Sequence, residues 1–371
     1  MSRVFPMNSS LALLQLLLIN AATSCFAWGA IGHEIVGNIA YNMLSGNTRA
    51  AVTDILFPDG YTSDDNFTSP IAAVANWADK VRYTKAFAWT TPLHYVDVMD
   101  TEISGGCHPQ GNCTFVYERD CQNDKCAVGA IVKFTHSSIG YKVSGDKDVL
   151  VESVWVDPGL IRGSKKVFPA TDESIASIMN ITQRESLMFL IHIIGDVHQP
   201  LHVSRASDKG GNSIHVDFPD EFEGHLDQYG NAHKKWNLHS VWDTGIIERA
   251  LKLYFSIPEL FQMNIENDFL TKENIQAWLV CPSGLSKDCT TDWANESFLY
   301  AMNYAYQNED NMEVKDGDHL TEDYFISRLD IVKRRLAAGG LRLASTLEDI
   351  FGADTSTSTS TRSEVLMLKE F

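Results

Sequence analysis

Two pairs of histidine and aspartate, each spaced four residues apart, could bind a metal ion. His192 and Asp196 lie in the segment FLIHIIGDVHQPLHV, and His239 and Asp243 lie in WNLHSVWDTGII. On a helix, side chains four residues apart lie on one face, one turn from each other, and imidazole with carboxylate can bind Zn²⁺ from two sides. One such pair is more often an ordinary surface pair, but two pairs in otherwise apolar helices favour a metal site.

Further polar residues in apolar surroundings lie before and after the first pair. Pro200 should end the helix that carries it, so that His202 can fold back toward the pair. Asp79 lies in NWADKVR and His94 in TPLHYVDV. Taken separately, Asp79 would be interpreted as a buried carboxylate paired with Arg82, and His94 as a hydrogen-bonded core histidine.

The start of the chain changes that interpretation. Residues 1–27 have the pattern of a secretory signal peptide: Arg3, the apolar run LALLQLLLINAA, and small residues before a cleavage point after Ala27. Cleavage there would make Trp28 the first residue, with a free α-amine and a carbonyl oxygen that can chelate a metal together. His33 follows about one helical turn later, so a metal cluster at the new N-terminus is expected.

The remaining elements must position these residues. Apolar periodicity predicts helices at roughly 30–44, 70–85, 184–197, 239–254, 290–307 and 321–350. Short extended pieces in TPLHYVDVM and NSIHVDF are expected to pair as a small β ribbon. We therefore predict a single, mainly helical (all-α) domain over residues 28–352, with a long surface excursion at about 140–172 and a Ser/Thr-rich disordered tail at 353–371.

Cysteine usage agrees with export. Six cysteines follow the predicted leader, and they favour three disulfides with 15 connectivities that the sequence leaves open. Zinc binding by these cysteines is less favoured because no CxxC pair occurs. Glycosylation sequons lie at Asn66, Asn112, Asn180 and Asn295. We expect an extracellular or secretory-pathway protein without a membrane anchor, because no later segment is long and apolar enough to be one.

The charge excludes one class of nucleic-acid binding. The net charge of −18 would become −19 on loss of Arg3, and no Lys/Arg-rich stripe occurs. Tight nonspecific binding to duplex phosphates is therefore not expected. A nucleic-acid substrate remains compatible with this charge, since metal ions can hold phosphate locally.

At this point the sequence resembles a known family, the plant and fungal zinc-dependent single-strand nucleases and 3′-nucleotidases (class I nucleases of the S one and P one type). The resemblance extends over nearly all of the chain after the leader and includes DKVR, GGNSIHV and RLDIVKRRLAAGGLRLASTLEDIF. It implies the helical fold shared with phospholipase C and three zinc ions. The first ion would be held by Asp79, His94, His192 and Asp196; the second by the Trp28 amine and carbonyl, His33 and a bridging Asp196; the third by His202, His239 and Asp243.

The resemblance also implies roles outside the metal shell. Arg82 would stabilise charge on the phosphoryl group and Asp97 would orient the attacking hydroxide, although a surface ion pair between these two is the structural alternative. Tyr95 would stack on a base and Asn212 would hydrogen-bond one. His198, His225 and His233 match no residue of the family pattern and are interpreted as rim or surface residues.

The activity implied is hydrolysis of single-stranded RNA and DNA to 5′-phosphate products, together with a 3′-nucleotidase activity on mononucleotides; no stable protein partner is expected. Two other interpretations compete with it. A zinc phospholipase C would share the scaffold, but the last ligand pair here ends in Asp243 rather than a glutamate. A non-enzymatic exported zinc-binding protein would be expected to lack part of the ligand set, Arg82 or Asp97.

Overall fold

The computed structural model describes residues 28–65, 67–103, 106–109, 111, 113–139, 181–219, 236–281 and 285–352. Several predicted features lie outside these residues. They are the leader 1–27, the excursion 140–172, the tail 353–371, His225, His233 and the sequons at Asn66, Asn112 and Asn180.

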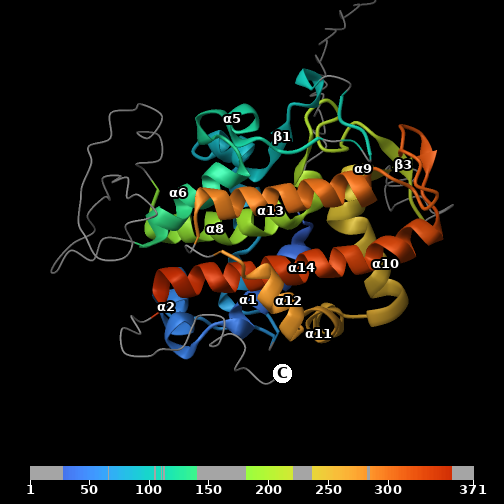
Figure 1. The fold of residues 1–371 in the computed structure, drawn as a ribbon. Coiled ribbons are helices and arrows are strands. Elements are labelled where there is room, and N and C mark those ends of the chain that lie inside the picture. The colour runs from blue at the N-terminus through green and yellow to red at the C-terminus, as the bar shows by residue number, and fades with distance from the viewer. Residues whose placement is uncertain are drawn as a thin grey trace, which may run out of the picture.

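The described chain is mainly helical, with short strands, as predicted (Figure 1). The longer helices are α1 (Ala30–Met43), α2 (Gly46–Leu56), α6 (Ala127–Ile139), α8 (Gln183–His198), α11 (Pro258–Phe269), α13 (Lys287–Tyr300) and α14 (Glu322–Phe351). The shorter α-helices are α3 (Pro70–Val74), α4 (Trp77–Val81), α5 (Tyr117–Asp120), α9 (Leu238–Ser240), α10 (Ile246–Ala250) and α12 (Lys272–Trp278). Tight 3₁₀ segments are η1 (Ala88–His94), η2 (Asp100–Glu102), η3 (Gln122–Asp124) and η5 (Pro200–His202), and wider π-helical segments are η6 (Val241–Gly245), η7 (Leu251–Phe255) and η8 (Ala301–Ala305).

Helix α8 lies at the centre of the fold. It begins with a capping box, in which the Thr182 side chain accepts from the Glu185 amide and the Glu185 side chain accepts from the Thr182 amide. Every residue from Ser186 to His198 is buried, as expected of a helix covered on all sides. Helices α6, α13 and α14 pack against it. The helix therefore carries His192 and Asp196 into the interior.

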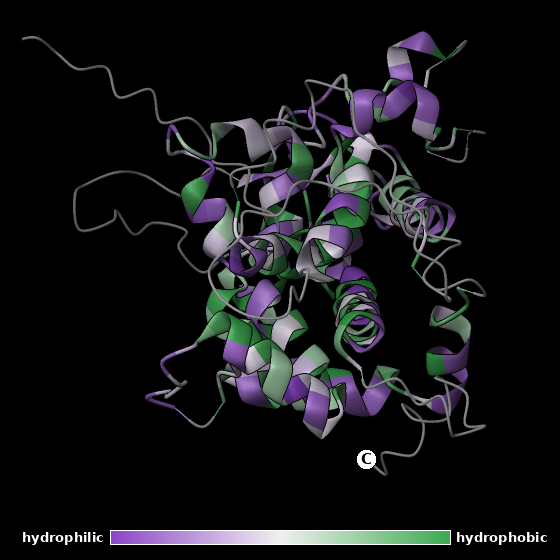
Figure 2. Ribbon diagram, turned by 90° about the vertical axis from the view of Figure 1, so that its left-hand side faces the viewer, coloured by the Kyte–Doolittle hydropathy of each residue, from purple (hydrophilic) through white to green (hydrophobic). Residues whose placement is uncertain are grey.

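Helix α14 spans the molecule and packs on both α1 and α8 (Figure 1). Thr321 caps its N-terminus through its side chain. A Cβ placed on Gly340 would come within 2.4 Å of Ile39 Cγ2, so glycine allows the close approach to α1. In the view of Figure 2 the helices carry both hydrophobic and hydrophilic stretches. The close packing of α14 on α1 fixes the helix that carries His33.

The predicted β ribbon is wrong in its pairing. Strand β1 (Val96–Val98) lies in TPLHYVDVM, but it pairs in parallel with β2 (Val203–Arg205). Strand β3 (His215–Asp217) lies in NSIHVDF and pairs with β4 (Trp236–Asn237) and β5 (Asp318–His319). Strands of two or three residues do not specify their own partner or register. Their pairing here therefore depends on the tertiary contacts.

The predicted helices agree in part with the structure. The predictions 30–44, 184–197 and 321–350 correspond closely to α1, α8 and α14, and 239–254 is a continuous helical run with π-helical turns. In place of the predicted helix 70–85 the structure has two short helices, α3 and α4. They are separated by Ala75 and Asn76. Apolar periodicity did not predict α2, α6, α11 and α12.

The six cysteines form three local disulfides, Cys107–Cys113, Cys121–Cys126 and Cys281–Cys289. This pairing resolves the open connectivity and leaves no thiolate of these residues for zinc. Within the described residues, no helix combines the length and the apolar character needed to cross a membrane.

Candidate metal centre

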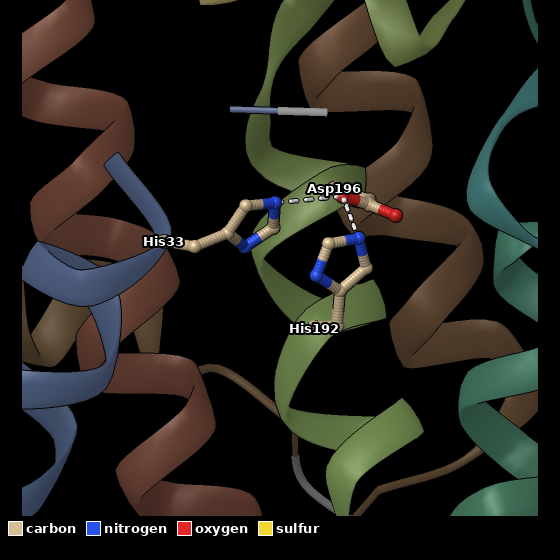
Figure 3. A group of neighbouring side chains, drawn as sticks. All are labelled: His33, His192 and Asp196. Carbon is tan, nitrogen blue, oxygen red and sulfur yellow. Dashed lines mark ion pairs between the residues drawn. The ribbon is translucent and has the colours of Figure 1, made fainter. Parts of the chain in front are cut away.

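The first group of candidate ligands joins α1 to α8. His33 Nε2 lies 3.2 Å from Asp196 Oδ1, and His192 Nε2 lies 3.4 Å from the same oxygen (Figure 3). The rings of His33 and His192 stack with centroids 3.9 Å apart. Thus the predicted i,i+4 pair exists, and α1 contributes a third ligand to it.

A second group shares His192 with the first. Asp79 Oδ1 in α4 lies 3.6 Å from His192 Nε2 and 3.6 Å from His94 Nδ1. His94 Nδ1 also lies 3.1 Å from Asp196 Oδ2. Two neighbouring sets of metal-ligating atoms, His33–His192–Asp196 and Asp79–His94–His192, therefore adjoin at α8.

The third group lies beyond the end of α8, where the chain does fold back at Pro200. His202 Nε2 and His239 Nε2 are 3.1 Å apart, and Asp243 Oδ2 lies 3.4 Å from His239 Nε2. Asp243 stands in the π-helical segment η6; such wider turns often occur at functional sites. One ligand atom from each of these three residues lies within 4.8 Å of the others.

Buried polar atoms without hydrogen bonds mark the first two groups. Within the described chain, four such atoms each lie 3.2 to 3.6 Å from another of the set: His33 Nε2, Asp79 Oδ1, His192 Nε2 and Asp196 Oδ1. A buried polar atom without a partner is costly, and buried charges are normally paired or coordinate a metal. The residues thus fit metal ions on the chemistry of their donor atoms alone.

Main-chain carbonyls orient three of the histidines. The Nδ1 atoms of His192, His202 and His239 each lie 2.6 Å from a carbonyl oxygen, that of Ala75, His94 and Gly210 respectively. An Nδ1–H that donates to a carbonyl leaves Nε2 as the ligating atom. The carbonyl of Gly210 reaches His239 because Gly210 has a φ of +64° and a Cβ there would lie 2.5 Å from Leu201 O.

Burial keeps several imidazoles neutral. It lowers the pKa of His33 and His94 well below the usual value, and burial together with nearby His239 lowers the pKa of His202 to about 3. Neutral imidazole is the form that binds a metal. These histidines need lose no proton before they bind.

Arg82 is buried beside the second group. Its Nε lies 3.4 Å from Asp79 Oδ1, and an Nη donates to the Tyr83 hydroxyl at 3.0 Å. Arg82 is 4% exposed, so the alternative of a surface ion pair with Asp97 is wrong in placing Arg82 at the surface. The prediction that Asp79 is a buried carboxylate paired with Arg82 is confirmed, but the same carboxylate also faces two histidines.

Asp97 lies on β1, opposite Ser204 of β2. Burial, followed by the nearby carboxylates of Asp208 and Asp100, raises the pKa of Asp97 to about 6. A carboxylate with this pKa can exchange a proton near neutral pH.

Tyr95 and Asn212, the predicted base-binding residues, are both half-buried. Tyr95 precedes β1, and its carbonyl accepts from the Ala127 amide at 2.9 Å. Asn212 donates to Lys209 O at 2.7 Å and accepts from Asn237 at 3.4 Å. Asn212 therefore belongs to the turn whose Gly210 carbonyl orients His239.

Trp28 is fully buried and belongs to the hydrophobic core. The next residue, Gly29, donates its amide to Asp243 O at 2.8 Å. The start of the described chain thus lies beside the third group, and α1 carries His33 from there to the first group.

His198 is not a rim or surface residue, so that prediction is wrong. It is 0% exposed, its Nδ1 lies 2.7 Å from Ile194 O, and its Nε2 lies 3.0 Å from an Nη of Arg342. Arg342 and Arg335 both pair with Glu296. His198 is a core histidine on the side of α8 that faces α13 and α14.

The sequence analysis also missed Gln199, which is fully buried. Its side-chain amide donates to Asp243 Oδ1 at 2.5 Å. The available signal in the sequence was its position in HQPLH, between the pair His192 and Asp196 and the next candidate ligand, His202.

Comparison with known proteins decides the family. The S1/P1 nuclease profile matches residues 28–154 and 161–352. The chain belongs to the S1/P1 nuclease family. It is 34% identical over 346 residues to Endonuclease 4 of Arabidopsis thaliana, covering 91% of this chain and 92% of that protein. It is 33% identical to Endonuclease 2 of the same plant, over 90% of this chain and 94% of that protein. Nuclease P1 of Penicillium citrinum is 29% identical, over 88% of this chain and 99% of that protein.

Family membership confirms several expectations. This S1/P1 family member is a hydrolase of phosphodiester bonds with a helical fold. The family is metal-dependent, and the three His/Asp groups offer the atoms that metal ions need. The phospholipase and non-enzymatic interpretations lose their support.

Proposed function

We propose that this protein is an exported endonuclease that uses three zinc ions to hydrolyse single-stranded RNA and DNA, leaving 5′-phosphates. The ions would occupy the two adjoining groups and the third group in the ligand sets implied by the family resemblance. The proposal further includes hydrolysis of the 3′-phosphate of mononucleotides.

The observation that carries this proposal is the set of buried ligand atoms without hydrogen bonds around Asp196, together with the third group, whose His202 follows six residues after Asp196. Zinc ions bound there would supply an activated water at neutral pH and positive charge for the phosphoryl oxygens. The lowered pKa values of His33, His94 and His202 favour the neutral imidazole, which is the form that binds zinc. The chain's overall negative charge would then matter little at the site itself.

The chain's own residues would have separate tasks. Arg82, fixed by Asp79 on one side and by Tyr83 on the other, would hold a guanidinium toward the phosphoryl group. Asp97, with its raised pKa, would take or orient a proton of the attacking water. Tyr95 would stack a base, which suits a nuclease with little sequence preference.

Export is supported by the leader pattern and by three disulfides, which persist in oxidising compartments. N-glycosylation is part of the same proposal. Of the four sequons, the described Asn295 lies within α13, and its Oδ1 accepts from the Phe115 amide at 3.1 Å.

The test is metal analysis of the purified secreted protein, combined with digestion of matched single-stranded and duplex oligonucleotides. We expect three zincs per chain, faster cleavage of the single strand, and product ends that a 5′-phosphate-dependent exonuclease accepts. Zinc-free protein of full activity, or products with 5′-hydroxyl ends, would contradict the proposal.

A further inference from the structure

Every polar group of Gln199 forms a hydrogen bond, and these bonds connect Asp196 of the first group with His202 and Asp243 of the third. Its amide N–H donates to Asp196 O at 2.9 Å, and its carbonyl accepts from the His202 amide at 3.0 Å. In the side chain, Oε1 accepts from the Leu201 amide at 2.5 Å and Nε2 donates to Asp243 Oδ1 at 2.5 Å. This fully buried residue therefore ties the end of α8, the turn to His202 and the carboxylate of Asp243 together.

The two oxygens of Asp243 have different surroundings. Oδ1 accepts the Gln199 amide and lies 4.0 Å from His202 Nε2, whereas Oδ2 lies 3.4 Å from His239 Nε2. A hydrogen bond to one oxygen fixes the rotation of the carboxylate and so decides which oxygen faces the histidines.

We propose that Gln199 is a positioning residue that holds Asp243 by Oδ1, so that Oδ2 is presented to the metal of the third group. This inference rests on the proposed function, since it concerns the ion expected between His202, His239 and Asp243.

The chemistry of the amide suits this task. A neutral donor satisfies a buried carboxylate oxygen without cancelling its charge. A lysine or arginine in the same place would neutralise Asp243 and repel a cation. Gln199 thus stabilises the orientation of Asp243 while leaving its negative charge for the metal.

Two substitutions separate this role from a general structural one. Gln199→Met keeps the side-chain length but removes both side-chain hydrogen bonds. Gln199→Asn keeps an amide oxygen able to accept from the Leu201 amide two residues on, but it is one methylene too short to reach Asp243. The matched control is Gln262→Met, because Gln262 is also buried and donates to a carboxylate, Glu266 Oε1 at 2.8 Å, in α11.

The measurement is zinc per chain after equilibration with graded concentrations of a chelator, with thermal unfolding of the metal-free proteins alongside. We expect both Gln199 variants to release one zinc at a chelator concentration about 10- to 100-fold lower than wild type requires. The other two zincs and the Gln262→Met control should follow wild type. In a His239→Ala background, already without that ion, Gln199→Asn should change nothing further.

The other possible outcomes contradict either the role of Gln199 or the proposed function. Parallel zinc release in wild type and both variants overturns the role of Gln199. Easier zinc release in Gln199→Met but not in Gln199→Asn also overturns the role of Gln199 in positioning Asp243. The important contact would then be the hydrogen bond from the Leu201 amide, which Gln199→Asn keeps. If Gln199→Met does not fold, Gln199→Asn alone decides. A wild-type protein that binds no zinc at the third group overturns the proposed function itself.

Discussion

The amide of Gly29 donates to the carbonyl of Asp243 at 2.8 Å. This bond places the residue after Trp28 against η6, the segment that carries Asp243, a candidate ligand of the third group. A Cβ on Gly29 would lie 2.5 Å from Thr244 Oγ1 and 3.2 Å from Asp243 O, so the chain passes close to η6. The position of Gly29 and that of Asp243 are therefore coupled.

The first prediction concerns the N-terminus that cleavage of the proposed leader after Ala27 would create. A protein that begins Gly-Trp28 should fold and form its disulfides, but its Trp28 nitrogen becomes an amide without an available lone pair. We expect fewer than three zincs per chain and loss of most nuclease activity. Mass spectrometry verifies the terminus and elemental analysis counts the metal. Full activity with the extra glycine present would show that Trp28 is only a core residue.

A second prediction concerns Asp196, whose two oxygens face three histidines. Asp196→Asn removes one negative charge from both adjoining groups, so activity should collapse and zinc should fall by more than one per chain. Asp330→Asn is the control, because Asp330 is 75% exposed on α14. Zinc analysis and single-strand cleavage of both variants are the measurements. A variant that retains three zincs and most activity would rule out a bridging role.

The third prediction concerns Tyr95 and base stacking. Tyr95→Ala should weaken binding of short single-stranded oligonucleotides by roughly 1 to 3 kcal/mol per stacked base while zinc content stays the same. Tyr254→Ala, which removes a 54% exposed tyrosine in η7, should leave binding unchanged. Fluorescence titration with a non-cleavable oligonucleotide measures both. Equal affinity of the two variants would assign Tyr95 to packing.

A fourth prediction follows from the pKa of Asp97, raised to about 6 chiefly by burial. A proton-accepting Asp97 is ionised only above this pKa, so activity should rise with pH through about 6. Asp97→Asn should lose most activity and this acidic limb, with zinc content unchanged. An unaltered pH profile in the variant would remove Asp97 from the reaction.

The same shift predicts an effect on stability. The folded-state pKa of Asp97 lies above the ordinary value of 3.8, so its protonated form favours folding, and that contribution is lost as pH rises toward and through about 6. Metal-free Asp97→Asn should therefore unfold at a higher temperature than metal-free wild type at pH 7. The difference should shrink below pH 4. Thermal unfolding by circular dichroism at both pH values tests this, and a less stable variant at pH 7 would contradict it.

The sequence by itself determined what depends on neighbours along the chain. The four-residue spacing of His192 and Asp196, and of His239 and Asp243, fixes each pair on one helical face. Apolar periodicity located α1, α8 and α14, and Pro200 marked the end of α8. The family resemblance then connected these local signals to one ligand set.

The tertiary structure decided what depends on distant parts of the chain. It paired β1 with β2 rather than with β3, buried His198 against Arg342, and brought the Gly210 carbonyl to His239 and the Gln199 amide to Asp243. Periodicity reports which face of a helix is apolar, but not which other segment covers that face. Hydrogen bonds that orient a ligand join residues far apart in sequence, and they form only when the packed helices bring those residues within about 3 Å of each other.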